Sequence, residues 1–438
     1  MLDRLFALET FGIKLGLENI TRLCAALGHP EHSFVTVHIA GTNGKGSVAA
    51  MAHAALLAAG VRAARYTSPH LTDITERFTV GDRAVDVAVL ERTVARVLDC
   101  AAALQASGEL RVPPTFFEAA TATAFELFRA EGIEVAIIEV GLGGRFDATN
   151  VITPAVAAIT TIGYDHQQYL GDTLEEIAFE KAGIIKAGVP TVMGALPPAA
   201  AEVVRRVAAE RHAPIIEASQ DATVTADMSD GAACVTIRTA SDVYGPLVLG
   251  LRGAHQVSNA LVAVRLLETA RTSAAIPLSR AAIESGLMRP DWPARLELFA
   301  LPDGQRVLMD AAHNIDGAMA LAEYLRRWHP ERPALVFGVM HDKDVDTMLR
   351  ALIPAVSSLT ATAARTSRAM PPEELARRAA QIAIELTPGG KPIPISAVAD
   401  PDEAVDTALS RTSTVCVAGS IFLAGAVREG LRRRTLRR

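Results

Sequence analysis

The chain has few cysteines, and none of them has the spacing of a metal or redox motif. Cys24, Cys100, Cys234 and Cys416 are scattered through 438 residues. Without a CxxC pair, this pattern indicates neither a zinc site nor a disulfide framework. Cys416 lies in the apolar run 415–418, so we expect it to be an ordinary core residue.

The chain also lacks an excess of positive charge and any long apolar run. Its 43 Lys and Arg residues against 49 Asp and Glu residues give a net charge of −6. This balance gives no general attraction for nucleic acid or an anionic membrane, and we interpret the arginine-rich stretch 432–438 as a solvated tail. No apolar stretch is long enough to span a bilayer, and residues 1–14 lack the core of a signal peptide. We therefore expect a cytoplasmic protein with no nucleic-acid or membrane partner.

Length and patterning predict two α/β domains. A composition of 50% hydrophobic and 21% charged residues is ordinary for a soluble α/β enzyme. Strand-like and helix-like segments alternate as far as residue 286, which predicts a mostly parallel sheet with flanking helices. Residues 220–252 alternate in short runs that predict a small antiparallel β insert. A second, smaller Rossmann-like series without GxGxxG follows, so we assign an N-terminal domain to 1–298 and a C-terminal domain to 299–438.

The most informative stretch is the glycine-rich segment 41–47, GTNGKGS. An apolar strand, 35–39, precedes it, and an alanine-rich helix, 48–57, follows it. Strand, glycine loop with a lysine, and helix are the setting of a phosphate-binding loop. Glycines allow successive N–H groups to converge on an anion, the helix N-terminus adds positive charge, and Lys45 can reach the β and γ phosphates. A glycine-rich turn with a chance lysine is the alternative.

This loop departs from the commonest phosphate-loop motif at two positions. The common form has glycine where this chain has Ile39, and Ser or Thr where it has Gly46. GTNGKGS is instead similar to the form found in ATP-dependent Mur-type amide ligases.

Polar side chains follow several other predicted strands: Ser68, Glu139, His166, Asp310 and His313. The ends of parallel strands share one crevice, so these residues can meet there. A carboxylate that ends an apolar strand, as Glu139 does, needs a metal or a cation nearby. With His166 it could hold Mg²⁺, which takes one or two protein ligands plus phosphate oxygens. The alternatives are a salt bridge from Glu139 to Arg145 and an ordinary loop histidine at His166.

Nine motifs in order make a family resemblance specific. They are HIAGTNGKGS, YTSPHL, TFFE, EVGLGGRFDATN, a histidine followed by FEKAGI, HQVSNA, WPARLE, DAAHN and GVMHDKD, between about residues 14 and 425. Together they resemble the folylpolyglutamate synthase/dihydrofolate synthase family, which is related to the Mur ligases. The resemblance implies an enzyme that uses ATP to add L-glutamate to dihydropteroate, to reduced folates or to both. It also implies an acyl-phosphate intermediate, with ADP and phosphate as products.

The resemblance further implies roles for matching residues. The ATP contacts would be Gly44, Lys45, Gly46, Ser47, Asn259, Arg295 and Asp310. One or two Mg²⁺ ions would be held by Ser68, Glu139, His166 and a carbamylated Lys181, with Ser47 able to share that task. The catalytic set would be Lys45, His166, Lys181 and His313. An unmodified ammonium group would repel the ion, and the alternative for Lys181 is an ordinary surface lysine.

The acceptor substrate would contact a separate group of residues. This group is Lys14, Leu15, Gly16, Leu17, Thr115, Phe116, Phe117, Glu118, Phe146, Asp147 and Ala148. Asp147 would anchor the pterin by hydrogen bonds, and the alternative is a structural cap. TFFE favours relatives that accept dihydropteroate. Ile315 stands where many relatives have proline, a change that leaves His313 in place.

Two rival functions remain at this point. A cell-wall Mur ligase acting on a nucleotide-sugar peptide usually has an extra N-terminal domain, and we expect no room for one before a phosphate loop at residue 41. A non-catalytic ATP-binding regulator would have no need for Lys45, Glu139, His166 and Lys181 together. We expect a monomer that acts on dihydropteroate, folates and L-glutamate. Whether it makes dihydrofolate, extends polyglutamate tails or does both stays open.

Overall fold

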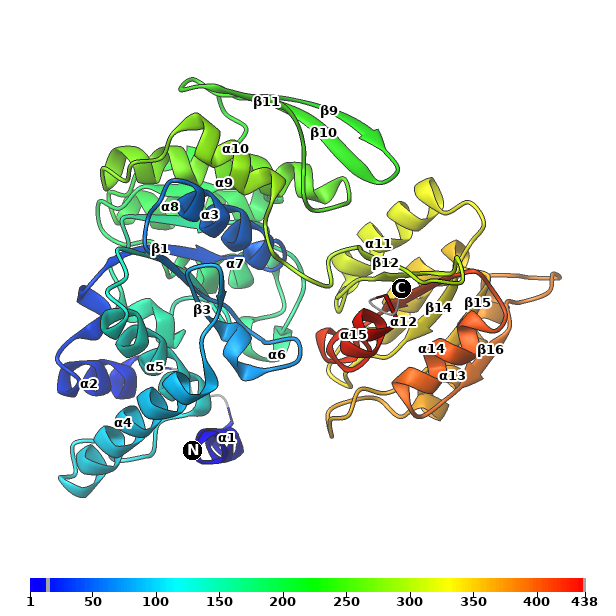
Figure 1. Ribbon diagram of the computed structural model, residues 1–438, viewed down its shortest axis with the longest axis horizontal. Coiled ribbons are helices and arrows are strands. Elements are labelled where there is room, and N and C mark those ends of the chain that lie inside the picture. Colours follow the sequence, from blue (N-terminus) through cyan, green and yellow to red (C-terminus); the bar gives the residue numbers. More distant parts are fainter. Residues whose placement is uncertain (13–15, 436–438) are drawn as a thin grey trace.

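The computed structural model describes residues 1–12 and 16–435, which form two α/β domains side by side (Figure 1). The N-terminal domain is built on an eight-stranded sheet of order β4-β3-β2-β5-β1-β6-β7-β8. All neighbours from β2 to β8 are parallel, and β3 and β4 add an antiparallel edge. The strands are β1 Val35–Ala40, β2 Ala63–Tyr66, β3 Phe78–Val80, β4 Arg83–Ala84, β5 Val135–Glu139, β6 Val156–Ile159, β7 Thr191–Met193 and β8 Ile215–Glu217.

The register of the central strands places the main candidate residues at one edge. β5 is buried along its whole length, as expected for a parallel strand covered on both faces. Ile39 on β1 pairs with Glu139 on β5, and Ala40 pairs with Ile159 on β6. The loops after β1, β5 and β6 therefore leave the sheet at the same level.

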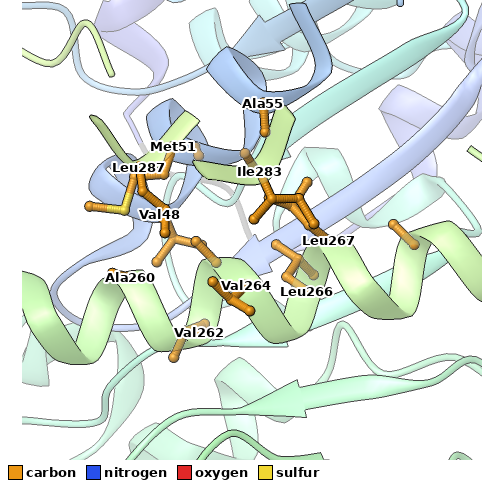
Figure 2. Packing of buried hydrophobic residues seen from close by; sticks show 14 of the residues in the cluster. Val48, Met51, Ala55, Ala260, Val262, Val264, Leu266, Leu267, Ile283 and Leu287 are labelled. Carbon is orange, nitrogen blue, oxygen red and sulfur yellow. The ribbon is translucent and has the colours of Figure 1, made fainter. Parts of the chain in front are cut away.

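Helices cover both faces of this sheet. One face packs against α3 Lys45–Ala58, α9 His255–Ser273 and α10 Arg280–Met288, where Val48, Met51 and Leu267 interdigitate (Figure 2). The other face packs against α2 Glu18–Ala26, α4 Val87–Ala106, α5 Phe116–Ala130, α7 Leu174–Ala182 and α8 Pro198–Glu210. The short helices of this domain are α1 Leu2–Phe6, η1 Ala7–Phe11, η2 Pro30–His32, η3 Ile74–Arg77, η4 Ala148–Val151 and α6 Gln167–Leu170.

The predicted antiparallel insert is confirmed. It comprises β9 Thr223–Ser229, β10 Ala232–Arg238 and β11 Val243–Val248, in the order β11-β10-β9. Ala233, Val235 and Ile237 alternate inward on β10 and join the core beneath α9 and α10. The insert approaches the C-terminal domain, where Arg252 Nε donates to Tyr324 Oη at 3.1 Å.

The C-terminal domain contains a six-stranded sheet of order β12-β13-β17-β14-β15-β16, parallel except for β12. Its strands are β12 Glu297–Ala300, β13 Arg306–Met309, β14 Ala334–Phe337, β15 Ser358–Ala361, β16 Ile395–Ala397 and β17 Thr414–Ala418. Its helices are α11 Ile315–Trp328, α12 Val345–Leu352, η5 Ile353–Ala355, α13 Pro372–Glu385, α14 Pro401–Leu409 and α15 Ile421–Thr435. Because β12 begins at Glu297 and pairs with β13, this sheet starts slightly before the division at residue 298.

The α/β class, the large mostly parallel sheet and the smaller second domain all agree with the sequence-based expectation. The segment after β2, which carries the YTSPHL motif, also contains η3 and the β3–β4 hairpin, neither of which was predicted from the sequence. None of the helices in the described part of the chain is both long and apolar enough to cross a membrane.

Candidate active site

The phosphate loop joins β1 to α3. Gly44 precedes α3 in the left-handed region, at φ 84°, and no side chain caps the helix. The N–H groups of the first turn are therefore available to an anion. Lys45 Nζ donates to the carbonyl oxygens of Gly41 and Thr42, at 3.1 and 3.2 Å. These weak internal contacts place the ammonium group where phosphate oxygens could replace the carbonyls.

Helix α9 supports this loop from one side. A Cβ on Gly44 would collide with the amide of Asn259, so the loop needs glycine there for space as well as for its φ. Asn259 Nδ2 donates to Gln256 Oε1 at 2.9 Å, and Gln256 Nε2 donates to Ser47 Oγ at 3.3 Å. This chain of bonds fixes the Ser47 hydroxyl in a buried position.

A cavity of about 450 Å³ lies between the phosphate loop and the C-terminal domain. It falls within the usual size of a small-molecule site. Every residue predicted to contact ATP or metal lines it, although these residues come from widely separated parts of the sequence. They are Gly44, Lys45, Gly46, Ser47, Ser68, Glu139, His166, Lys181, Asn259, Arg295, Asp310 and His313.

Glu139 is a buried carboxylate with little compensation from hydrogen bonds. It is 4% exposed, and it accepts one bond, from the Ser68 N–H at 3.3 Å. Burial raises its pKa, although Lys45 and Arg295 oppose the rise. The alternative of a salt bridge to Arg145 is wrong, because Arg145 pairs with Glu180 at 2.6 Å. A positive ion bound in the cavity would stabilise the ionised form of Glu139.

Lys181 is a second buried ionisable group in the cavity, and no carboxylate of the described residues forms a salt bridge with it. It is 5% exposed, so the alternative of a surface lysine is wrong. Its Nζ donates to the Gly41 carbonyl at 3.0 Å. Burial, reinforced by Lys45, lowers the pKa of Lys181 to about 7. A substantial fraction of this amine is therefore neutral near pH 7, and the neutral amine is the form that can react with carbon dioxide.

The donors in the cavity fit Mg²⁺, which prefers oxygen ligands and completes its shell with phosphate and water. Glu139 retains carboxylate capacity beyond its single bond, and the serines Ser47 and Ser68 line the same cavity. Among the described residues, the one cluster of three His, Cys, Asp or Glu side chains close enough to hold an ion alone is His29, Glu31 and His32; none of these lines the cavity. A metal here would therefore depend on the nucleotide for much of its coordination.

Asp165, which precedes His166, joins the two domains. Its Oδ1 accepts a bond from Lys343 Nζ at 2.5 Å, and its Oδ2 accepts one from Asn314 Nδ2 at 3.1 Å. Burial would raise the Asp165 pKa, but His166, Lys343 and His313 outweigh burial and hold it below its usual range. Asn314 also exchanges amide hydrogen bonds with Asn43, at 3.0 and 3.4 Å. The phosphate loop is thus tied directly to the start of α11.

The remaining candidates from the C-terminal domain have fixed orientations. His313 Nδ1 lies 2.8 Å from the Ala311 carbonyl, so Nδ1 carries the proton and Nε2 faces Asp165 at 3.8 Å. Burial lowers the His313 pKa to about 4, which keeps the ring neutral at pH 7. Asp310 accepts bonds from the N–H groups of Leu296 and Ala312, both at 2.9 Å. Its carboxylate therefore organises the strand end as well as lining the cavity.

Among the described residues, none of those predicted for the acceptor side lines this cavity. Lys14 and Leu15 lie outside the described residues. Leu17, Phe116, Phe117 and Ala148 belong to one hydrophobic cluster, while Gly16 adopts φ 137° just before Leu17. Thr115 and Glu118 form the capping box of α5, and Phe146 lies 4.1 Å from the Arg145 guanidinium.

Asp147 connects this cluster to the cavity. Its Oδ2 accepts bonds from the Gly141 and Leu142 N–H groups, at 3.0 and 2.9 Å. Its Oδ1 accepts two bonds from Thr149. Asp147 is therefore a structural cap here, the alternative that the sequence left open. Because Gly141 lines the cavity and packs on the ring of Phe117, the acceptor-side cluster and the cavity share a wall.

Several residues of the site were not predicted. Asp165, Gln256, Asn314 and Lys343 all lie inside or beside the motifs noted above. The roles of Asp165, Asn314 and Lys343 depend on contacts between the domains, and the role of Gln256 depends on a contact between α9 and the phosphate loop. The motifs marked the correct segments without indicating which side chains would meet.

Comparisons with known proteins agree with this geometry. Residues 39–267 match the Mur ligase middle domain, and residues 294–421 match the Mur ligase glutamate ligase domain. A dihydrofolate synthase/folylpolyglutamate synthase of Bacillus subtilis is 38% identical over 348 residues, which cover 78% of this chain and 79% of the relative. The Mycobacterium tuberculosis protein of the same name is 36% identical over 437 residues, which cover 94% and 89%.

Solved structures show the same likeness over the whole chain. A Mycobacterium tuberculosis folylpolyglutamate synthase complexed with ADP has a TM-score of 0.89 at 32% identity, and the match covers 98% of each chain. The Escherichia coli protein FolC in complex with DHPP and ADP has a TM-score of 0.85 at 27% identity, and the match covers 99% of this chain and 98% of that one.

Proposed function

The chain belongs to the folylpolyglutamate synthase/dihydrofolate synthase family of Mur-type ligases, and we propose that it carries out the reaction of that family in the cavity between its domains. The enzyme joins the amine of L-glutamate to a carboxylate of dihydropteroate or of a reduced folate, and it consumes ATP. The observation that carries this proposal is the convergence of the phosphate loop, Glu139, Lys181 and His313 on one cavity of about 450 Å³.

ATP would bind with its phosphates on the loop between β1 and α3. The free N–H groups of the first turn of α3 would hold the phosphate oxygens, and Lys45 would exchange its carbonyl contacts for the β and γ phosphates. Arg295 and Asn259 line the remaining wall. Phosphoryl transfer depends mainly on positioning and charge neutralisation, which these donors supply.

The acceptor would approach from the wall formed by Gly141, above Phe117. Its carboxylate oxygen attacks the γ-phosphorus, the bond to ADP breaks, and an acyl phosphate forms. The neutral amine of glutamate then attacks the acyl carbon, and phosphate leaves with the oxygen that the carboxylate contributed. His313, whose Nδ1 faces the Ala311 carbonyl, would present the unprotonated Nε2 as a hydrogen-bond acceptor toward the incoming amine.

Glu139, Ser68, His166 and Ser47 would hold Mg²⁺, which when bound neutralises charge on the transferring phosphoryl group. Carbamylation of Lys181 would turn a repulsive ammonium group into an oxygen ligand for a second ion. The low pKa of this amine supports that modification. The cytoplasmic location and the monomeric state expected from the sequence stay predictions.

The two domains would close over the substrates and keep water from the acyl phosphate. The bonds from Lys343 and Asn314 to Asp165 support a closed arrangement in this structure. A crosslink that fixes the domains in an open orientation should abolish turnover. Undiminished turnover in that crosslinked protein would contradict closure.

The deciding assay supplies purified protein with ATP, Mg²⁺ and L-glutamate, and compares dihydropteroate with a reduced folate as acceptor. We expect phosphate release that requires both glutamate and an acceptor, together with a product one glutamate heavier by mass spectrometry. Ligation of dihydropteroate alone, of the folate alone or of both distinguishes the three forms of the activity. Ligation of neither would overturn the proposal.

A further inference from the structure

Gly46 is one of the two positions at which the phosphate loop departs from the common motif, and the structure gives a steric reason for it. Gly46 lies in the first turn of α3, and its φ is not in the left-handed region that requires glycine. Alanine would suit this helical backbone better than glycine does. However, a Cβ at Gly46 would fall inside the indole ring of Trp292, against Cζ2, Cε2 and Nε1. The indole occupies the space that a side chain at position 46 would need.

Trp292 lies in the linker between α10 and β12, so this contact joins the linker to the nucleotide-binding loop. Two guanidinium groups lie over its ring, that of Arg65 at 5.0 Å and that of Arg295 at 5.8 Å. Arg65 also donates to the carbonyl of Asp291 at 3.3 Å. The indole N–H meets no acceptor among the described residues. Trp292 is therefore held by packing and by cation–π contact, not by hydrogen bonds.

The backbone around Arg295 is constrained on both sides. Ala294 and Leu296 have φ values of 55° and 50°, in the left-handed region that non-glycine residues rarely adopt. The N–H of Ala294 donates to Glu297 and the N–H of Leu296 donates to Asp310, both at 2.9 Å. Such a backbone persists only when its surroundings hold it. Arg295 therefore moves with the linker and not independently of it.

We propose that Trp292 is a positioning residue that docks the interdomain linker onto the first turn of α3 and thereby sets Arg295 against the nucleotide. Gly46 is required because the indole fills the place of its side chain. Trp292 does not line the cavity, so it acts on ATP through Arg295 and the phosphate loop. This inference rests on the proposed nucleotide site, and it adds a residue that couples this site to the linker between the domains.

A double-mutant cycle tests this coupling directly. Gly46→Ala, Trp292→Ala and the double variant are compared with the wild type by calorimetric titration with ADP, which needs no acceptor substrate. We expect Gly46→Ala to weaken binding by about 10-fold in the wild-type background and by less than about 2-fold in the Trp292→Ala background. An equal loss in both backgrounds would overturn the proposal. No ADP binding by the wild type would instead contradict the proposed function, so the two failures are distinguishable.

Steady-state kinetics supply a readout that a merely structural role would not produce. Trp292→Ala should raise KM for ATP by about 10-fold and leave KM for glutamate within about 2-fold. Trp292→Phe keeps an aromatic ring under the guanidinium groups, so its KM for ATP should be close to that of the wild type. An equal rise in both KM values would contradict positioning through Arg295. Gly430→Ala, another helical glycine with only Asp402 Oδ1 near its Cβ, is the matched control and should behave as wild type.

The chain contains two tryptophans, which permits a spectroscopic test. In a Trp328→Phe protein, Trp292 is the single tryptophan, and its emission should change when ADP binds because the first turn of α3 lies against the ring. In a Trp292→Phe protein, Trp328 lies on α11 beside Arg327 and its emission should stay constant. A nucleotide-dependent change from Trp328 but not from Trp292 would contradict the proposal.

Discussion

The nucleotide cavity and the acceptor-side cluster differ in how their buried charges are compensated. Within the part of the chain that the structure describes, Glu139 accepts a single hydrogen bond, and Lys181 donates to one carbonyl and forms no salt bridge. Asp147, equally buried, accepts four bonds, from three N–H groups and one hydroxyl. Buried charges without compensation are costly, and they persist where a charged ligand completes them. The difference indicates that the cavity is suited to a polyanion bound together with cations. On the acceptor side, the buried carboxylate of Asp147 already has its hydrogen bonds, and the surface is mostly apolar.

The largest effect should follow removal of the lysine in the phosphate loop. Lys45→Met should lower kcat by about 10³-fold, because the transferring phosphoryl group loses the cation proposed to contact the β and γ phosphates. Phosphate release measured at saturating ATP checks this value. Lys391→Met, at an exposed loop position, is the control and should retain full activity. A decrease in kcat of less than about 10-fold for Lys45→Met would contradict the role of this cavity as the site of phosphoryl transfer.

Glu139→Gln should separate activity from stability. The amide keeps the shape but removes the charge, so we expect kcat to fall by about 10²-fold. The free energy of unfolding should stay equal or rise, because the buried carboxylate is poorly compensated in the free protein. Chemical denaturation and phosphate release, measured on the same preparation, check both outcomes. A large loss of stability would show that Glu139 is a structural residue.

Asp147→Asn should show the opposite behaviour. The amide nitrogen cannot accept hydrogen bonds, so either the loop at Gly141 or the cap at Thr149 loses its acceptor. We expect the free energy of unfolding to fall by about 2 kcal/mol, as measured by urea denaturation. If stability were unchanged, Asp147 would not be the completed structural cap described here.

The burial of Lys181 should make the stability of the protein depend on pH. Its pKa is about 7 in the folded protein and near 10.4 in an unfolded chain, so between these values the unfolded state binds more protons. The cost of burying Lys181 is therefore fully present below pH 7 and is relieved as the pH rises toward 10. In bicarbonate-free buffer, the free energy of unfolding of the wild type should increase by about 1.4 kcal/mol per pH unit relative to that of Lys181→Met over this range. Parallel stability curves for the two proteins would contradict a buried, uncompensated amine.

The smallest effect should come from the apolar acceptor side. Phe117 packs under Gly141 and lies 6.1 Å from the ring of Tyr66. Phe117→Leu should raise KM for the acceptor by about 5-fold, since roughly 1 kcal/mol of apolar contact is lost. KM for ATP in the same variant should not change. A rise in KM for ATP alone would place Phe117 on the nucleotide side.

The sequence was sufficient to predict elements whose apolar pattern is strong. The buried strands β1 and β5 and the three-stranded insert lie where the patterns indicate them. The β3–β4 hairpin was missed because β4 contains just two residues, both exposed, and carries no alternation. The predicted domain boundary at residue 298 falls inside the edge strand β12. This strand is hard to recognise in the sequence because it pairs on one side alone and mixes polar with apolar residues.

The candidate site was predictable where a single motif carries it. Some site residues occur in motifs that can be recognised from the local sequence alone. These are the phosphate loop, Glu139, Lys181 and Asp310, and all of them line the cavity. The bonds from Lys343 and Asn314 to Asp165 and the contact between Trp292 and Gly46 join segments more than 140 residues apart. The bonds to Asp165 depend on how the two domains dock, and the contact at Gly46 depends on how the linker packs against α3; no local sequence pattern records either.

The most direct test of the account follows one oxygen atom through the reaction. Dihydropteroate or a reduced folate is labelled with ¹⁸O in the reacting carboxylate and incubated with the enzyme, ATP, Mg²⁺ and unlabelled L-glutamate, and the released phosphate is analysed by mass spectrometry. The proposed mechanism predicts one ¹⁸O atom in each phosphate. The carboxylate oxygen joins the acyl carbon to phosphorus in the acyl phosphate, and it leaves with phosphorus when the amine attacks. Product formation with unlabelled phosphate would contradict the acyl-phosphate chemistry assigned to this cavity.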